Sequence, residues 1–272
     1  MQTKKMRIVL IGAGRLAVNL GRALLRSGHE VVYVLGRSED TTSALADMLQ
    51  CPCSTNMAGI PLDADMYMVC VNDESLPDVV ASLPPLPALV VHTAGSLSLQ
   101  VFEGTSLSRY GIFYPMQTFS KEVAADFSDI PCFIEASDES DLDLLESFSQ
   151  TLTHRVFRLS SEKRRHLHLA AVFAGNFSNY CYAVAGQLLA ENGLPFDVML
   201  PLIDQTARKV HSMTPVEAQT GPAARGDKAV MEAQAALLAN HPELKELYLL
   251  MSSGIRCAVQ QEKATKRMMT DD

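Results

Sequence analysis

Continuous apolar runs alternate with amphipathic segments along the first part of the chain. Runs of this kind, typical of strands buried on both faces of a parallel sheet, stand at 7–11, 31–35, 66–71 and 88–92. Behind the first run, apolar residues recur at helical spacing, at Leu16, Leu20, Ala23 and Leu24. Weaker strand patterns follow at 111–114, 132–136 and 155–159, with a helical pattern over 139–151. The alternation predicts an α/β fold with a doubly wound parallel sheet of the Rossmann type.

The pattern becomes purely helical after Leu159. Apolar positions at helical intervals predict one helix from Ser161 to Asn192, and shorter patterns predict helices over 196–213, 228–239 and 242–261. A helix of that first length would extend about 45 Å, which is longer than a small domain is wide, so part of it is expected to pack against a second subunit. We therefore predict an N-terminal Rossmann domain over 1–159 and an all-helical domain over 160–272 for substrate binding or dimerisation.

Composition narrows the class of partner. The 272 residues carry a formal net charge of -8, which disfavours binding to nucleic acid, and 47% of them are hydrophobic, enough for more than one core. No apolar run reaches the roughly 18 residues that a membrane-spanning helix needs, and no signal-peptide core follows Met1. The six cysteines lack metal-ligand spacing. We expect a cytoplasmic protein with reduced thiols, no metal site and a small-molecule substrate.

A glycine-rich segment lies between the first strand and the first helix. It matches the dinucleotide fingerprint, with alanine at the third conserved position, through Gly12, Ala13, Gly14, Arg15, Leu16 and Ala17. Gly12 permits the tight turn and Gly14 lets the backbone approach a pyrophosphate, while the helix N-terminus offers free N–H groups. The segment predicts a dinucleotide site.

The end of the second predicted strand indicates which dinucleotide binds. Proteins that prefer NAD usually place an acidic residue there for the ribose hydroxyls, whereas this chain has Gly36, Arg37 and Ser38. Arg37 can pair with a 2′-phosphate and Ser38 can donate a hydrogen bond to it, so NADP is the expected cofactor. The alternative for Arg37 is an exposed loop charge.

Polar residues follow the next two strands, where open α/β sheets bind ligands. Val71, Asn72 and Thr93 are expected to line the nicotinamide side of the cofactor. A loop-capping role for Asn72 and Thr93 stays open. His92 fits a hydrogen-bonded histidine at a strand end better than a catalytic one.

Five motifs together resemble a known family. They are Gly12-Ala-Gly-Arg-Leu-Ala17, His92-Thr-Ala-Gly-Ser96, Tyr114-Pro-Met-Gln-Thr-Phe119, His168-Leu-Ala-Ala-Val-Phe-Ala-Gly-Asn-Phe177 and Thr220-Gly-Pro-Ala-Ala-Arg-Gly-Asp227. Over nearly its whole length the chain resembles Rossmann-like oxidoreductases that carry a helical C-terminal domain of unknown function. It is more distantly similar to pyrroline-5-carboxylate reductase, ketopantoate reductase and the β-hydroxyacid dehydrogenases. The resemblance implies NADP binding, a homodimer and a reductase activity.

The long helix contains two candidate catalytic residues, Asn176 and His168. In the β-hydroxyacid dehydrogenases a lysine one turn before an asparagine protonates the substrate oxygen, and Asn176 could be that asparagine. Val172 stands at the lysine position, so no ammonium group is available there. His168 lies eight residues before Asn176, about 12 Å along the axis, so the two cannot hold one small group within one subunit. For His168 a packed or surface position is the competing interpretation.

The segment from Thr220 to Asp227 is a candidate substrate loop. Arg225 could clamp a substrate carboxylate, with Asp227 orienting it or Thr220 capping the neighbouring helix. An internal Arg225–Asp227 pair that only fixes the loop is an equal alternative. The sequence thus favours an NADPH-dependent reductase acting on a carbonyl or imine of a small anionic substrate. A catalytically silent NADP-binding sensor or assembly protein is the competing hypothesis.

Overall fold

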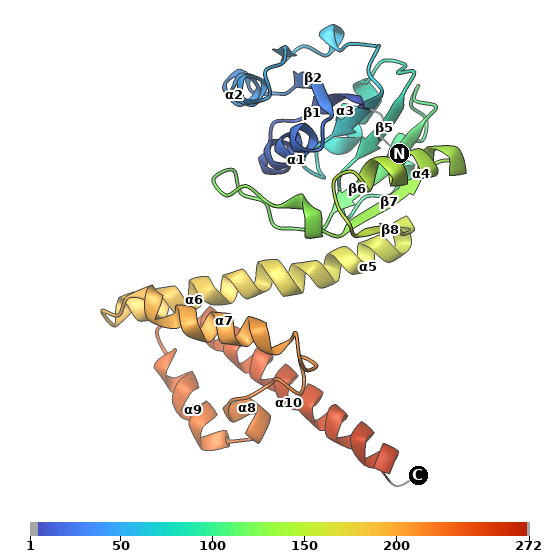
Figure 1. The fold of residues 1–272 in the computed structure, drawn as a ribbon. Helices are drawn as coiled ribbons and strands as arrows, with labels where there is room; N and C mark the ends of the chain where they lie inside the picture. Colours follow the sequence, from blue (N-terminus) through green and yellow to red (C-terminus); the bar gives the residue numbers. More distant parts are fainter. Residues whose placement is uncertain (1–4, 271–272) are drawn as a thin grey trace. The chain divides into compact units, whose positions relative to one another are not determined.

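The computed structural model describes residues 5–270 and divides into two compact units, Met1–Cys181 and Tyr182–Asp272. The first unit is built on an eight-stranded sheet in the order β3-β2-β1-β4-β5-β6-β7-β8 (Figure 1). Its strands are β1 Arg7–Ile11, β2 Glu30–Leu35, β3 Cys53–Ser54, β4 Met66–Val69, β5 Leu89–His92, β6 Tyr110–Pro115, β7 Cys132–Ala136 and β8 Val156–Arg158. The strand order reverses between β1 and β4, where doubly wound sheets bind their ligands.

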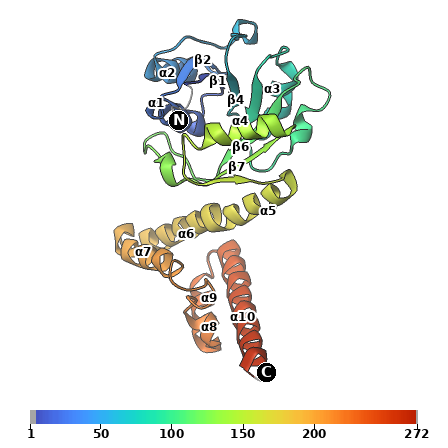
Figure 2. The ribbon, with the colours of Figure 1, turned by 45° about the vertical axis from the view of Figure 1, so that its right-hand side comes forward.

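Helices cover both faces of this sheet, as the doubly wound prediction requires (Figure 2). One core cluster combines the sheet with α1 (Arg15–Arg26), α2 (Glu39–Leu49) and α4 (Glu139–Ser149). The other combines it with α3 (Leu76–Ser82) and the short helix η2 (Leu99–Phe102). Successive strand residues alternate between the clusters: Ile8 and Leu10 belong to the first, Val9 and Ile11 to the second. This alternation explains why the strands have continuous apolar sequences.

Two strands depart from the parallel arrangement, because β7 pairs antiparallel with β6 and β8 pairs parallel with β7. The connection between β6 and β7, residues 116–131, contains only the single turn η3 (Phe127–Asp129). Parallel neighbours need a crossover connection, usually a helix, to carry the chain back to the other end of the sheet. This connection instead runs beside α1, where the buried Asn19 binds the backbone of Ser120 and Ala125.

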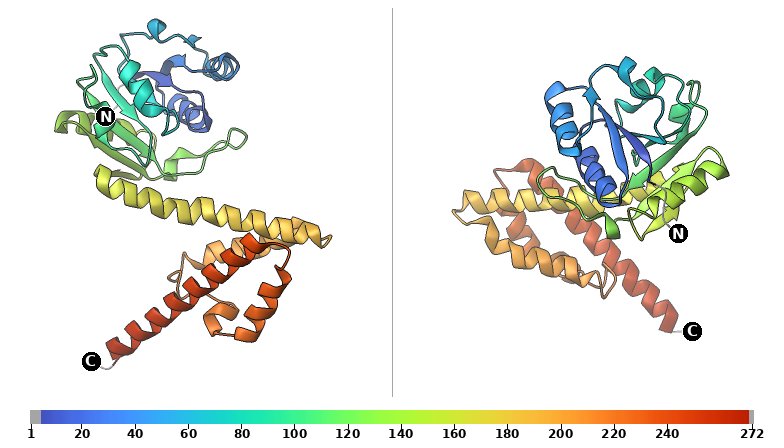
Figure 3. Two further views of the ribbon diagram at one scale, coloured as in Figure 1. Left: turned by 180° about the vertical axis from the view of Figure 1, so that it is seen from behind. Right: turned by 45° about the horizontal axis from the view of Figure 1, so that its top comes forward.

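The predicted long helix is present as one helical run from Ser161 to Glu191 (Figure 3). It consists of α5 (Ser161–Ala171), the π-helical segment η4 (Val172–Phe177) and α6 (Ser178–Glu191). The sheet gives way to helix between Arg158 and Ser161, whereas the two compact units divide between Cys181 and Tyr182. The functional domain boundary at 159/160 stays a prediction.

In the described residues of the second unit, all regular secondary structure is helical, and few side chains are buried. Its helices are the end of α6, η5 (Phe196–Met199), α7 (Leu200–Lys209), α8 (Pro222–Arg225), α9 (Lys228–Leu237) and α10 (Pro242–Thr270). The last helix continues past the predicted end at 261, with Lys266 paired to Glu262 one turn earlier. Among the described residues of this unit, the buried apolar side chains are Ala223, Ala235 and Leu238. Within residues 5–270 no helix is long and apolar enough to cross a membrane.

Candidate functional site

The glycine-rich turn has the geometry of a phosphate-binding loop. Gly12 has a φ of +114°, and a Cβ there would lie 2.5 Å from the Cys70 carbonyl oxygen, so only glycine fits. Gly14 is the N-cap of α1, where no side chain caps the helix and no acidic residue occupies the first turn. The N-terminal amides of α1 therefore remain available to an anion.

A cavity of about 420 Å³ opens beside this turn at the carboxyl ends of β1, β2 and β4. Most of the residues predicted to bind the cofactor line it, namely Gly12, Ala13, Gly14, Arg37, Ser38, Val71 and Asn72. Arg15, Leu16 and Ala17 form the first turn of α1 beside them. The cavity has the glycine cradle, the helix N-terminus and the cationic side chain that a phosphorylated dinucleotide requires.

Two of the residues predicted to bind the cofactor also form structural hydrogen bonds. The Thr93 hydroxyl donates to the Val69 carbonyl oxygen at 3.3 Å, and Thr93 is buried outside the lining of this cavity. Asn72 does line the cavity, and its Oδ1 accepts a bond of 3.2 Å from the Ser75 amide. Asn72 therefore caps the turn into α3 as well as facing the cavity.

At the end of the cavity next to β2, α2 packs closely against Gly36. A Cβ on Gly36 would lie 2.0 Å from Thr42 Oγ1, which itself donates to the Ser38 carbonyl oxygen at 2.5 Å. Gly36 is thus required for the packing of α2 against β2. It also leaves this position without a carboxylate. Arg37 and Ser38 are exposed and line the cavity, as a role in binding a 2′-phosphate requires.

The structure adds a cationic residue that the sequence did not reveal. Lys121, in the connection after β6, lines the same cavity as Arg37 although the two are far apart in the chain. Asn19 holds this connection: its amide group donates to the Ser120 carbonyl oxygen at 2.7 Å and accepts from the Ala125 amide at 2.9 Å. A buried asparagine on the otherwise apolar face of α1 was the available signal.

A tyrosine and a histidine meet near the carboxyl ends of β5 and β6. Tyr114 Oη and His168 Nδ1 are 3.0 Å apart, which is hydrogen-bond distance. The His168 ring occupies the space left by Gly95, because a Cβ there would lie 2.4 Å from Nδ1. Burial raises the pKa of Tyr114, and the nearby Asp73 carboxylate raises it further. The phenol is therefore protonated at neutral pH and can donate a proton or a hydrogen bond.

His92, by contrast, is held inside the protein. Its side chain is fully buried, its Nδ1 accepts from the Ala94 amide at 3.2 Å, and its ring stacks on Phe102. Burial, with a smaller contribution from the charge of Arg164, lowers the pKa of His92 to about 3. His92 is consequently neutral and structural near neutral pH, in line with the interpretation favoured from the sequence.

Asn176 lies in the π-helical segment of the long helix. It is exposed, as are Phe173 and Phe177 on either side of it. Within residues 5–270 the side chain of Asn176 forms no hydrogen bond, whereas the Ser178 hydroxyl donates to the Phe173 carbonyl oxygen at 3.2 Å. π-helical segments occur frequently at functional sites, so its position is compatible with the predicted substrate contact.

The predicted substrate loop lies entirely within the second unit. Thr220 and Arg225 line a cavity of about 410 Å³ together with Lys263. Asp227 is the N-cap of α9, and its Oδ1 accepts from the Val230 amide at 3.2 Å. Across residues 5–270 no ion pair joins Arg225 to Asp227, so the guanidinium of Arg225 is not held by that carboxylate.

Comparisons with known proteins place these features in context. The family described as NADP oxidoreductase, coenzyme F420-dependent, matches residues 7–94, and a domain of unknown function (DUF2520) matches residues 130–255. A crystal structure from Bacteroides fragilis, of a "putative NADP oxidoreductase", is 47% identical over 93% of this chain and 98% of its own, with a TM-score of 0.87.

More distant structures share the fold. A Thermotoga maritima protein is 23% identical over 93% of this chain and 99% of its own, with a TM-score of 0.79. The 1-pyrroline-5-carboxylate reductase of Streptococcus pyogenes is 16% identical over 96% of this chain and 99% of its own, with a TM-score of 0.62. No protein of curated function matches the chain.

Proposed function

Because the chain belongs to the family of NADP-dependent oxidoreductases represented by the Bacteroides fragilis structure, we propose that it reduces a carbonyl or imine of a small anionic substrate with NADPH. One observation carries the proposal. The dinucleotide cavity and the Tyr114–His168 hydrogen bond both lie at the carboxyl ends of the parallel strands. Reduction needs a hydride and a proton at the same substrate bond, and this arrangement provides a place for each.

The first unit would hold the cofactor. The amides at the N-terminus of α1 would bind the pyrophosphate, and Arg37 and Ser38 would bind the 2′-phosphate with Lys121 nearby. The chemistry that NADPH supplies when bound is a hydride. The dense packing of Gly36 against Thr42 fixes the backbone from which Arg37 projects.

The proton would come from the Tyr114–His168 pair. The phenol of Tyr114 would donate its proton to the substrate oxygen or nitrogen, and His168 would return a proton to the phenol. This pair replaces the lysine that Val172 leaves missing. Asn176 would orient the polar atom of the substrate by hydrogen bonding in the cleft of a second subunit, because His168 and Asn176 are too far apart along one helix to act on the same group.

The second unit would recognise the substrate's anionic group. Arg225 can bind a carboxylate through two parallel hydrogen bonds, and Thr220 offers a hydroxyl in the same cavity. Asp227 would act on the substrate indirectly, by capping α9 and so fixing the loop that carries Arg225.

A homodimer would cover the apolar surface that the single chain leaves exposed. Large apolar side chains are exposed along the long helix at spacings of one turn, at Leu169, Phe173, Phe177 and Tyr180. The second unit likewise exposes many large apolar side chains while burying few. Exposed apolar surface on this scale marks an interface, and a second copy of the chain presents a matching one.

Oxidation of NADPH across a panel of 2-keto acids and carboxylated cyclic imines tests the proposed activity. Asn176→Ala and Arg225→Ala should each lower turnover of any active compound while leaving NADPH affinity within about a few fold, because cofactor and substrate contacts are separable. Arg26→Ala, an exposed arginine outside both cavities, is the matched control. Thermal unfolding of each variant separates lost chemistry from lost folding. A stable, fully active pair of variants would remove both residues from the site.

A further inference from the structure

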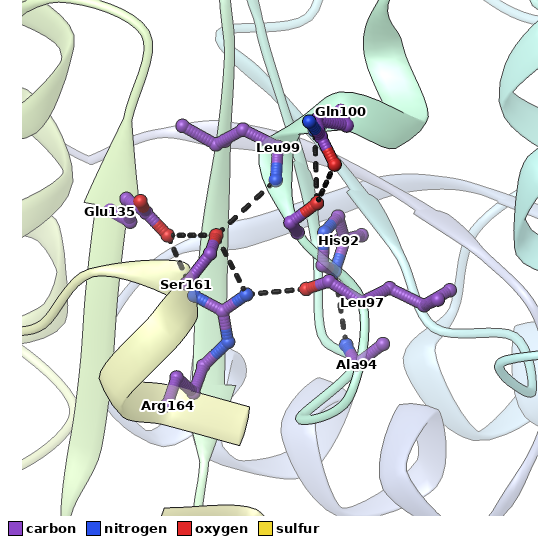
Figure 4. A network of polar contacts seen from close by, with 9 residues as sticks. His92, Ala94, Leu97, Leu99, Gln100, Glu135, Ser161 and Arg164 are labelled. Atoms are coloured by element: carbon purple, nitrogen blue, oxygen red, sulfur yellow. Dashed lines mark hydrogen bonds and ion pairs between the residues drawn. The ribbon is translucent and has the colours of Figure 1, made fainter. Parts of the chain in front are cut away.

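Arg164 is a fully buried arginine in the first turns of α5 (Figure 4). Its Nη1 donates to Glu135 Oε2 at 2.8 Å, and its Nη2 donates to the Leu97 carbonyl oxygen and to Ser161 Oγ. Glu135 belongs to β7 and Leu97 to the loop after β5. One guanidinium therefore joins the long helix to a strand and to a loop.

Further hydrogen bonds close this network. Ser161 Oγ donates to Glu135 Oε2 at 2.5 Å and accepts from the Leu99 amide at 3.3 Å. At the other end of the same loop, His92 Nδ1 accepts from the Ala94 amide. The loop between β5 and η2 is thus held at both ends, with Gly95 between them.

The network lies one helical turn from the candidate proton donors. Arg164 and His168 are four residues apart on α5, so they project from the same face of the helix, about 6 Å apart along its axis. His168 reaches Tyr114 only because its ring fits over Gly95, in the loop that Arg164 holds. The hydrogen bonds of Arg164 therefore fix both partners of this contact. They hold α5, which carries His168, and through Leu97 they hold the loop that contains Gly95.

We propose that Arg164 is a positioning residue. Its buried guanidinium, by binding Glu135 and the Leu97 carbonyl oxygen, holds His168 at hydrogen-bond distance from Tyr114. The inference rests on the proposed role of that pair in reduction. Apolar residues could pack α5 against β7 equally well, because buried ion pairs often add little stability. A planar guanidinium is required when several acceptors on different segments must be held at once, and a lysine ammonium cannot reproduce that geometry.

The test measures whether the Tyr114–His168 bond depends on Arg164. In the full-length protein labelled with ¹⁵N-histidine, Tyr114→Phe should change the ¹⁵N chemical shift of His168 Nδ1, since it removes the hydrogen bond. The same substitution should cause no change in an Arg164→Lys background, where the charge stays but the bond to Leu97 is lost. In an Arg165→Met background, which alters the exposed neighbouring arginine, the change should persist.

The same chemical-shift change in the parent and Arg164→Lys backgrounds would overturn the proposal. If Arg164→Lys does not fold, the test uses the Arg164→Met/Glu135→Leu protein, which removes both charges of the pair. In that background too, Tyr114→Phe must leave the ¹⁵N chemical shift of His168 Nδ1 unchanged. Turnover is a separate measurement. Coupling that depends on Arg164, combined with unchanged turnover in Tyr114→Phe, would uphold the positioning role and reject the proposed function of the pair.

Discussion

A single added methyl group at residue 95 should break the Tyr114–His168 hydrogen bond. The Cβ of Gly95→Ala would lie 2.4 Å from His168 Nδ1 and 2.9 Å from Tyr114 Cε2. To reach ordinary contact distance the imidazole must retreat by about 1 Å. Because the donor and acceptor are 3.0 Å apart, such a shift moves them beyond hydrogen-bond range. The φ of Gly95 lies outside the left-handed range, so no backbone strain obscures the effect.

The size of the effect follows from the role assigned to the pair. Overpacking of a close-packed site costs about 1–3 kcal/mol of folding stability. This loss is smaller than the total stability of most folded proteins, so the Gly95→Ala protein should still fold. Positioned proton donors contribute roughly 10²- to 10⁴-fold to reaction rates. The kcat/KM of Gly95→Ala for a reducible compound should therefore fall at least about 100-fold, equivalent to about 2.7 kcal/mol of barrier.

Steady-state oxidation of NADPH, with thermal unfolding measured alongside, is the assay. Gly254→Ala is the matched control, because a Cβ at Gly254 meets no atom within 4 Å and lies within a helix. The control should keep parental kcat/KM. A folded Gly95→Ala protein with parental kcat/KM would refute the reasoning that places the proton donor at this pair.

Three other outcomes are expected. Arg37→Asp should abolish or reverse a preference for NADPH over NADH, and equal affinities in the parent, measured by fluorescence titration, would contradict the 2′-phosphate site. Because the folded pKa of His92, about 3, lies below its unfolded value of about 6.5, acid favours the unfolded chain. His92→Phe should therefore reduce by about 2 kcal/mol the stability lost between about pH 7 and about pH 5 in denaturant titrations; an unchanged loss would contradict it. Sedimentation at micromolar concentration should give a dimer, and a monomer would count against the proposed interface.

The parts of the account that the sequence predicted well are local. The dinucleotide turn could be recognised because the φ of Gly12 and the N-cap position of Gly14 are properties of one short strand–turn–helix segment. The strands were recognisable because burial on both faces leaves continuous apolar runs, as in β4 and β5. The family resemblance read from five motifs is confirmed by the Bacteroides fragilis structure.

Contacts between distant segments could not be predicted in this way. His168 lies 54 residues after Tyr114, and only the topology of the sheet and the anchoring of α5 bring their side chains together. Lys121 reaches the cavity through a connection whose course depends on one buried asparagine. For Thr93, the sequence left a ligand contact and a capping role open, and the structure shows that its hydroxyl binds the backbone of β4. Its role in cofactor binding stays a prediction.

The antiparallel course of β7 was also beyond the sequence pattern. A five-residue, mainly apolar strand such as Cys132–Ala136 has the same appearance in either direction. Its direction follows from a connection without a crossover helix, which the strand pattern alone does not encode.

The account's central claim is that hydride and proton are delivered at the carboxyl ends of the sheet, with Tyr114 and His168 supplying the proton. The most direct measurement compares the parent, Tyr114→Phe and His168→Ala in NADPH affinity and in turnover of one reducible compound. The account predicts NADPH dissociation constants within about a few fold of the parent and kcat/KM lowered at least about 100-fold in both variants. Folded variants that keep parental kcat/KM would contradict it.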